Sequence, residues 1–393
     1  MSRIQQVFGK TLVGAALAVS VAVPLGAAGA PQPRDVFYNF TGSPGGFAPD
    51  GRLIRDAAGN FYGVTFYGGG GTCYHGCGVV FKLSPLGVPT TLYTFTGGSD
   101  GRGPIGGVVA DAAGNLYGTA AGDAYNPGVV FKLTPGGQET VLHAFAGGGD
   151  GEIPSRGLIV DAAGNLFGTT GLGGAFNRGI VFKLAPDGTE TILHSFYMYG
   201  SGGGVIMDRQ GNLYGTVYGS LSDENPGAIF KITSNGVFSV LYTFTGGADG
   251  RHPIGSLFMD GQGALYGTTK KGGGSKGVAF KLAPDGTETV LHRFTGTPLD
   301  GALPDGGLIM DKQGNLFGTT SSGGPFHLGT VFQISPDGTE TLLHSFAGNN
   351  DTPPDGEVPH YVSLTPYMNR LYGTTPSGGT DGGGVVFEVR KAK

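Results

Sequence analysis

One block of sequence recurs along this chain at a period close to 50 residues, and this repetition limits the possible folds more than any other feature. The block reads Asp-x-x-Gly-Asn-Leu-Tyr-Gly-Thr, with small variations. Its copies start at Asp56, Asp111, Asp161, Asp208, Asp260 and Asp311, and a degenerate copy ends at Leu371–Thr375. Self-similarity at such a period is typical of propellers and solenoids, which repeat one supersecondary unit many times.

Two further blocks recur in a fixed order with the first. Gly-x-Val-Phe-Lys-Leu is centred on Phe81, Phe131, Phe182, Phe230, Phe280, Phe332 and Phe387. Val-Leu-His-x-Phe, or the same block with Tyr, ends at Phe95, Phe145, Phe196, Phe244, Phe294 and Phe346. The copy missing from this last set stands alone at the beginning, at Val36–Gly42.

Each unit divides into four short β-rich runs that are separated by Gly, Pro, Asp or Asn. In the sixth unit these runs are Gly307–Asp311, Asn315–Thr320, Gly329–Ser335 and Glu340–Phe346. Four strands in about 50 residues is the size of a propeller blade. We therefore predict an all-β protein, a seven-bladed β-propeller of four-stranded blades.

The offset between the blocks predicts how the ring closes. The chain begins with a fourth-strand sequence and ends, at Val389, after a third-strand sequence. In a ring, Val36–Thr41 would lie beside Gly384–Val389 and complete the last blade, which removes unpaired strand edges. The alternative is a linear β-solenoid, but this would call for polar capping repeats at both ends.

The first 30 residues have a composition of their own. Arg3 and Lys10 precede an apolar stretch over residues 11–25, and small residues follow at 26–30. This pattern is typical of a secretory signal peptide. The alternative is a membrane anchor, but a span needs about 20 apolar residues, and this run is nearer 15. We predict cleavage near Ala28–Ala30 and one exported domain, residues 31–393, that is periplasmic or extracellular and has no membrane span.

Charge argues against one class of partner. The chain has 24 Lys and Arg against 29 Asp and Glu, a formal net charge of -5, and no run of basic residues. Nucleic acids are bound through concentrated basic patches. We therefore expect no nucleic-acid partner.

The blocks at Asp311–Thr320, Gly329–Pro336 and Glu340–Gly348 resemble the Gloeobacter/Verrucomicrobia-type tandem repeat, the GloVer repeat of choice-of-anchor extracellular proteins. The resemblance extends from Val36 to Val389. It implies export, and it brings no catalytic residues with it. The Asp-x-x-Gly-Asn-Leu-Tyr block is also similar to a hairpin of NHL and gluconolactonase-like propellers, some of which are enzymes.

Most recurring polar residues are explained by the repeat itself. The Asp of the first block could be a metal ligand, but a role in a turn accounts for all copies. The His residues of the third block could bind metal or transfer protons, yet Tyr replaces them in other units, which fits a packed ring with a polar tip. They are His143, His194, His292 and His344, against Tyr38, Tyr93 and Tyr242. We expect no metal site and no cofactor.

Residues that break the repeat are better candidates for function. The first unit has an enlarged loop that contains Cys73, Tyr74, His75 and Cys77. In an exported chain the two cysteines favour a disulfide over free thiols or an incomplete zinc site. Arg55 replaces Ala, Val or Met in a strand that we expect near the channel, where it could contact a ligand or be solvated or paired. The remaining candidates for ligand binding are Tyr197, Tyr199, Asp223, Glu224, Lys270 and His327.

Three functions remain open from the sequence. The first is a non-catalytic, monomeric propeller that binds a glycan, a peptide or a surface protein through its variable loops. The second is an exported hydrolase, lyase or lactonase that works at the channel mouth. It requires carboxylates, His and Arg from different blades to meet there. The third is a purely structural envelope or adhesion module. We expect binding rather than catalysis, because no catalytic motif is recognisable.

Overall fold

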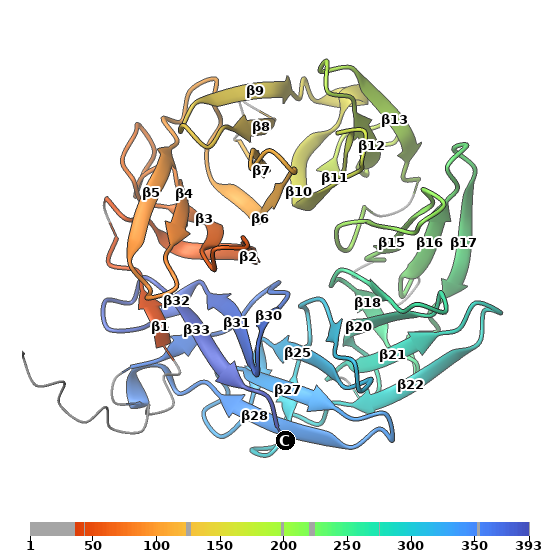
Figure 1. Ribbon diagram of the computed structural model, residues 1–393. Helices are drawn as coiled ribbons and strands as arrows, with labels where there is room; N and C mark the ends of the chain where they lie inside the picture. The colour runs from red at the N-terminus through yellow and green to blue at the C-terminus, as the bar shows by residue number, and fades with distance from the viewer. Residues whose placement is uncertain are drawn as a thin grey trace, which may run out of the picture. The chain divides into compact units, whose positions relative to one another are not determined.

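Short antiparallel strands account for almost all regular structure in the computed structural model (Figure 1), which describes residues 36–42, 44–122, 127–197, 200–219, 225–274, 276–351 and 354–392. All of them belong to one unit of the chain, Arg34–Lys393. The predicted signal peptide, residues 1–30, lies outside the described residues. In the part that is described, no helix is long and apolar enough to cross a membrane.

The longest sheet has eight strands in the order β5-β4-β3-β2-β6-β7-β8-β9. Its strands are β2 (Phe47–Arg55), β3 (Phe61–Tyr67), β4 (Val79–Leu83), β5 (Pro89–Thr94), β6 (Pro104–Ala110), β7 (Leu116–Ala120), β8 (Val129–Leu133) and β9 (Glu139–Ala144). Each half is a four-stranded antiparallel meander, and the halves meet at a parallel bridge between Arg52 and Gly107.

Five further sheets of four or five strands follow within the described residues. The first two contain β10 (Glu152–Val160), β11 (Leu166–Leu172), β12 (Ile180–Leu184) and β13 (Glu190–Ser195), then β14 (Ile206–Met207), β15 (Leu213–Val217), β16 (Ala228–Ile232) and β17 (Phe238–Thr243). The third contains β18 (Arg251–Pro253), β19 (Phe258–Met259), β20 (Leu265–Lys271), β21 (Val278–Leu282) and β22 (Glu288–Arg293). The fourth contains β24 (Ile309–Met310), β25 (Leu316–Thr320), β27 (Thr330–Ile334) and β28 (Glu340–Ser345).

The last sheet combines the two ends of the described chain. It has the order β1-β33-β31-β30, with β30 (Thr365–Tyr367), β31 (Arg370–Thr375), β33 (Val385–Arg390) and β1 (Val36–Asn39). β1 pairs antiparallel with β33, with Val36 opposite Phe387 and Asn39 opposite Val385. Small additions are the strand pairs β23 (Gly301–Ala302) with β26 (Ser322–Gly323) and β29 (Gly356–Glu357) with β32 (Ser377–Gly378), and the short 3-10 helices η1 (Gly148–Asp150) and η2 (Gly348–Asn350).

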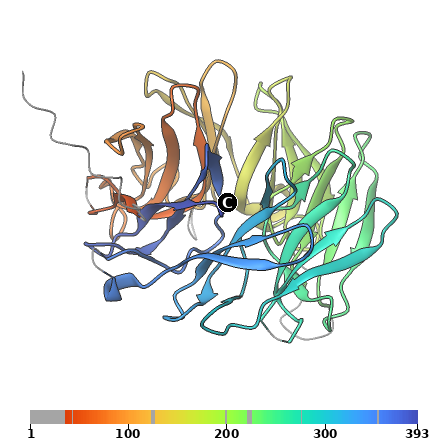
Figure 2. The ribbon, with the colours of Figure 1, turned by 60° about the horizontal axis from the view of Figure 1, so that its bottom comes forward.

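The sheets stand around a common centre, with β2, β6, β10 and β18 on the inside and β5, β9, β13, β17, β22 and β28 on the outside (Figure 1). Figure 2 shows the turns and loops at the two ends of the sheets. The predicted all-β propeller with four-stranded blades is therefore confirmed.

The recurring sequence blocks explain this architecture locally. Asp56 accepts hydrogen bonds from the backbone N–H of Asn60 at 2.8 Å and from its side-chain amide at 2.7 Å, which closes the turn between β2 and β3. The Gly of Leu-Tyr-Gly-Thr makes room for an aromatic ring, because a Cβ on Gly118 would lie 2.6 Å from Cζ of Phe131. Phe131 is fully buried and meets Phe95 of the preceding four strands edge-on at 5.1 Å. Neighbouring blades therefore pack through interleaved Phe rings.

Candidate functional site in the central channel

The innermost strands surround a cavity of about 690 Å³, a size common for small-molecule sites. These strands all run in the same direction, because every repeat has the same strand order. They begin at one face of the molecule, where Phe47, Glu152 and Arg251 lie, and this face is called the loop face below. Each innermost strand except β30 ends at an Asp turn on the opposite face, and β30 ends at a turn formed by Met368 and Asn369.

The cavity has a polar end and an apolar end. Its apolar lining comes from positions near the ends of the innermost strands and consists mainly of Ile54, Val109, Ile159, Ile206, Met207, Phe258, Met259, Ile309 and Met310. Its polar lining comes from positions near the loop face and includes Asp50, Arg52, Ser155, Arg156, Asp305 and Tyr361. The second set, with Lys270 and His360, is called the channel mouth below.

The charges of the channel mouth are not required by the repeat. A Pro recurs at the start of most innermost strands, and the residues that follow it are Asp50, Ile105, Ser155, Ile254, Asp305 and His360. Since Ile occupies this place in two units, a propeller blade folds without a charge there. Burying charged groups costs free energy unless they are well paired. Their presence at this place therefore suggests a role in binding or chemistry.

Asp305 is the centre of one ionic group. Its carboxylate is completely buried, and its Oδ2 lies 2.6 Å from Nδ1 of His360 and 3.3 Å from Nζ of Lys270. Its Oδ1 accepts a hydrogen bond from the backbone N–H of Tyr361 at 3.3 Å. Burial alone would raise the pKa of Asp305, but His360 and Lys270 outweigh it and hold the pKa below its ordinary value. Asp305 is therefore ionised at neutral pH.

Asp50 lies at the equivalent place on β2. Its carboxylate accepts a hydrogen bond from the backbone N–H of Gly106 at 2.7 Å. Burial raises the pKa of Asp50, while that hydrogen bond and the charges of Arg156 and His360 oppose the rise. Arg156 and His360 are therefore both close enough to Asp50 to interact with its charge.

Arg156 and Tyr361 meet across the cavity. The guanidinium carbon of Arg156 lies 3.3 Å from the centre of the Tyr361 ring. Both have a left-handed backbone, with φ of 65° and 59°. The equivalent residues of the first two units, Gly51 and Gly106, have φ of 76° and 74° and are free of Cβ strain. A non-glycine residue in this conformation costs about 1–2 kcal/mol, and such strain is concentrated at functional sites.

Arg52 is the unpaired charge of the channel mouth. It lines the cavity and, within the described residues, its guanidinium makes no ion pair and no hydrogen bond. The residue is exposed to solvent, and the protein atoms around its guanidinium partly desolvate this group and lower its pKa. Other units have Gly or Ser at the same place, at Gly107, Gly157, Ser256 and Gly307. A lone cation in a cavity is suited to an anionic ligand.

The residues predicted from the sequence are placed in several regions. Lys270 belongs to the channel mouth. Arg55 lies at the opposite end of β2, outside the lining of the cavity, where its guanidinium carbon stacks 3.5 Å from the centre of the Tyr367 ring. Tyr199, Asp223 and Glu224 lie outside the described residues.

The other predicted residues are on loop-face connections, away from the cavity lining. Cys73 and Cys77 form a disulfide. Tyr74 is 85% exposed and its ring contacts His75 at 3.9 Å. Tyr197 is 73% exposed and meets Phe176 edge-on at 5.0 Å, and His327 is exposed in the loop after β26. None of them is brought to the channel mouth.

Sequence reasoning missed most of the channel mouth: Asp50, Arg52, Arg156, Asp305, His360 and Tyr361. The information was present in the repeat. When the innermost strands are aligned, Arg52 stands where other units have Gly or Ser, and Arg156 stands where the first two units have Gly51 and Gly106. Arg55 departs from the repeat equally clearly, but it lies three residues further along β2 and therefore at the other end of the channel.

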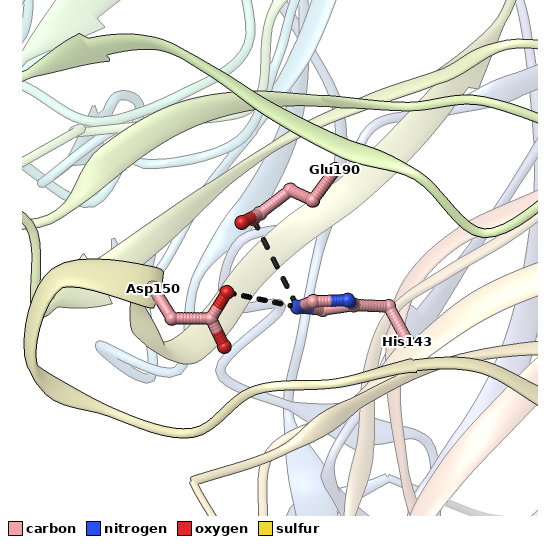
Figure 3. A group of neighbouring side chains, drawn as sticks. All are labelled: His143, Asp150 and Glu190. Atoms are coloured by element: carbon pink, nitrogen blue, oxygen red, sulfur yellow. Dashed lines mark ion pairs between the residues drawn. The ribbon is translucent and has the colours of Figure 1, made fainter.

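A second cluster of titratable groups lies on the outside of the sheets (Figure 3). Nε2 of His143 is 3.2 Å from Asp150 and 4.0 Å from Glu190, and one ligand atom of each residue lies within 4.8 Å of the others. Such a trio could hold a metal ion. Burial and the neighbouring Asp150 raise the pKa of Glu190 to about 8, so this carboxyl group keeps a proton at neutral pH.

The group of His143, Asp150 and Glu190, called the outer cluster below, is one copy of a contact that recurs along the chain. Tyr93 and Tyr242 take the place of His143 elsewhere, and each donates its hydroxyl to an Asp at 3.0 Å. The corresponding groups are Tyr93, Asp100 and Glu139, then Tyr242, Asp249 and Glu288, then His292, Asp300 and Glu340. Because Tyr replaces His, we interpret the trio as a structural contact between neighbouring blades.

Comparisons with known proteins agree with this fold. The family model of the Gloeobacter/Verrucomicrobia repeat matches residues 29–205 and 201–393. A search of curated proteins found no match. The structure resembles streptogramin B lyase with a TM-score of 0.60 at 15% identity, covering 90% of this chain and 96% of that chain. It also resembles the extracellular domain of BT4673 from B. thetaiotaomicron, described as a hybrid two-component system, with a TM-score of 0.59 at 12% identity, covering 92% of this chain and 40% of that one. At these identities the likeness shows the fold alone.

Proposed function

Because the chain belongs to the Gloeobacter/Verrucomicrobia repeat family, we propose that it is an exported seven-bladed propeller that binds a small organic anion in its central channel. The observation that carries the binding proposal is the unpaired guanidinium of Arg52 inside the cavity.

The seven blades follow from dividing the eight-stranded sheet at the bridge between Arg52 and Gly107. Each half then has the four-stranded meander of the other five sheets. The pairing of β1 with β33 supports closure of this ring, since it joins the first described strand to the last. A closed ring leaves few unpaired edges on its blades.

Export is supported by the composition of residues 1–30, which has the three regions of a signal peptide. A central cavity with rigid walls is suited to binding a small molecule.

The ligand class follows from the two ends of the cavity. The channel mouth has three cationic side chains, Arg52, Arg156 and Lys270, against two carboxylates, Asp50 and Asp305. An anionic group is therefore favoured at this end. The lining at the other end is formed by Ile, Val, Met and Phe side chains and favours an apolar group. A carboxylate with a short hydrocarbon part satisfies both.

The direct test is a calorimetric titration of the protein with straight-chain carboxylates from butyrate to decanoate, which measures the affinity for each. Arg52→Gly introduces the residue that occurs at Gly107 and Gly157, so the fold should tolerate it. A hydrogen bond to a charged group contributes about 1.5–3 kcal/mol, and affinity should fall by a factor of about 10 to 100.

Arg209→Ala is the matched control. Arg209 is exposed on an Asp turn at the opposite face, where three other units have Ala. Arg209→Ala removes the same charge at a place away from the cavity, so the affinity for these carboxylates should be unchanged. Absence of binding to all these carboxylates, or equal affinities of wild type and Arg52→Gly, would contradict the proposal.

A further inference from the structure

We infer that His360, paired with Asp305, is a general base of the channel mouth, and that this protein hydrolyses carboxylic esters whose acid product is bound at Arg52. The inference rests on the proposed anion binding and adds a reaction to it.

The arrangement of His360 and Asp305 is the first argument. Nδ1 of His360 lies 2.6 Å from a carboxylate that is completely buried. The contact is an ion pair by distance and does not have hydrogen-bond geometry. The negative charge of a buried carboxylate beside Nδ1 still favours the tautomer with its proton on Nδ1, which leaves Nε2 to accept a proton. Within the described part of the chain, Nε2 of His360 makes no hydrogen bond, and the side chain is 33% exposed. The imidazole is therefore partly open to solvent.

Lys270 is the second argument. Its Nζ lies 3.3 Å from the same Asp305 oxygen and balances the carboxylate charge. Asp305 therefore has a second basic partner besides His360. The three residues come from three different sheets, on β20 and just before β24 and β30. Other units have Ile105 or Ile254 at the place of Asp305 and His360. The blades with Ile at this place fold without an ion pair, so the fold alone does not require Asp305 and His360 here.

The third argument is the position of the group beside the proposed anion site. His360 directly precedes Tyr361, and both Tyr361 and Asp305 line the cavity. Asp50 interacts electrostatically with His360, and Arg52 follows two residues later on the same strand, about 7 Å along it. His360 is not itself in the lining of the cavity, but it lies directly beside lining residues at the end where the unpaired guanidinium is found.

These two groups fit the chemistry of ester hydrolysis. Nε2 of His360 removes a proton from a water molecule, whose oxygen forms a bond to the ester carbonyl carbon. The carbonyl electron pair moves to its oxygen, and the Arg52 guanidinium stabilises this oxyanion. The bond from carbon to the alcohol oxygen then breaks, and the departing alkoxide takes the proton from Nε2. The products are an alcohol and a carboxylic acid, which ionises and is the anion held by Arg52.

The experiment measures hydrolysis of 4-nitrophenyl esters of acetate to octanoate, and butyrate binding by the same protein. His360→Asn places an amide that can still donate to Asp305 but cannot act as a base. We expect kcat to fall at least about 100-fold, with KM and butyrate affinity nearly unchanged.

His194→Tyr is the control. His194 lies on the outer strand β13, and three other units have Tyr at this place, so ester hydrolysis should persist. If wild type binds butyrate but hydrolyses no ester, or if His360→Asn retains full kcat, the inference is overturned and the proposed binding function stands. If butyrate and its homologues do not bind, the binding proposal itself has failed.

Discussion

The guanidinium carbon of Arg156 lies 3.3 Å from the centre of the Tyr361 ring, although the sheets that carry these residues are separated by the eight-stranded sheet on one side and three sheets on the other (Figure 1). The contact therefore spans the channel mouth. Each of the two residues adopts a left-handed backbone that glycine adopts in the first two units. The fold accepts strain at two places in order to keep two large side chains over the cavity.

We predict that Arg156→Gly leaves stability almost unchanged but weakens ligand binding. Relief of left-handed strain is worth about 1–2 kcal/mol, and loss of the cation–π contact costs about 0.5–2 kcal/mol. The free energy of unfolding in urea should therefore shift by no more than about 1 kcal/mol. A fall of several kcal/mol would show that Arg156 is held for stability rather than for binding.

The reverse substitution at a neighbouring place should behave differently. A Cβ on Gly106 would lie 2.1 Å from the backbone nitrogen of Gly157, and Gly106 has φ of 74°. Gly106→Ala therefore combines backbone strain with a clash that no side-chain movement relieves, and should cost more than about 2 kcal/mol. Urea unfolding measures this, and an unchanged midpoint would contradict the close packing of the inner ring.

Much of the fold could be predicted from the sequence, because several copies of one block indicate the strand pattern more clearly than a single copy does. The second and third strands of each unit, such as β25 and β27, lie within the predicted runs Asn315–Thr320 and Gly329–Ser335. The first strand is less regular. The run Gly307–Asp311 contains only the two-residue strand β24, because Gly306 and Gly307 pack tightly against Val362 and Ser363 of the next unit.

The candidate site was harder to predict for a physical reason. The sequence pattern shows which residues depart from the repeat, but not how deep each lies in the channel. Lys270 was identified because it departs from the repeat, yet its partner Asp305 was not, because the sequence does not show that the two residues meet. Arg156 and Tyr361 are separated by two hundred residues and become neighbours only when the ring is formed.

Stability should depend on pH through the outer cluster. Burial and Asp150 raise the pKa of Glu190 to about 8, above its ordinary value in an unfolded chain. The folded state then holds a proton that the unfolded state has lost, so this contribution to stability is complete at acidic pH and disappears as pH rises toward 8. Glu190→Gln should match wild type at pH 5 and be more stable at pH 8, by on the order of 1 kcal/mol.

Thermal unfolding of both proteins at the two pH values measures this effect. Glu152→Gln, a substitution at the start of β10, is the control and should not change the pH dependence. An equal difference between Glu190→Gln and wild type at pH 5 and pH 8 would contradict the protonated Glu190.

The N-terminal strand should be essential for stability. Phe40 follows β1, is 1% exposed and packs edge-on against Phe81 at 5.1 Å. Removing residues 36–41 leaves β33 with an open edge and empties this part of the core, so the loss should exceed about 4 kcal/mol. Removal of Ala392 and Lys393 is the control and should cost little. If the two truncations unfold at the same urea concentration, β1 does not close the ring.

The disulfide between Cys73 and Cys77 should contribute modestly, because it closes a short loop. Replacing both cysteines by Ser should lower the free energy of unfolding by about 2 kcal/mol. The mass of the air-exposed protein should be lower than that of the reduced protein by two hydrogens. Two titratable thiols in air-exposed protein would contradict the disulfide.

The anion site at Arg52 is most directly tested by NMR of its side chain. The Nε–Hε resonance of Arg52 is assigned by its absence from the spectrum of Arg52→Gly and is followed during addition of octanoate. The account predicts a saturable shift of this resonance, with a Kd equal to the calorimetric value, while the Arg209 resonance stays in place. An unmoved Arg52 resonance at saturating octanoate would contradict the account.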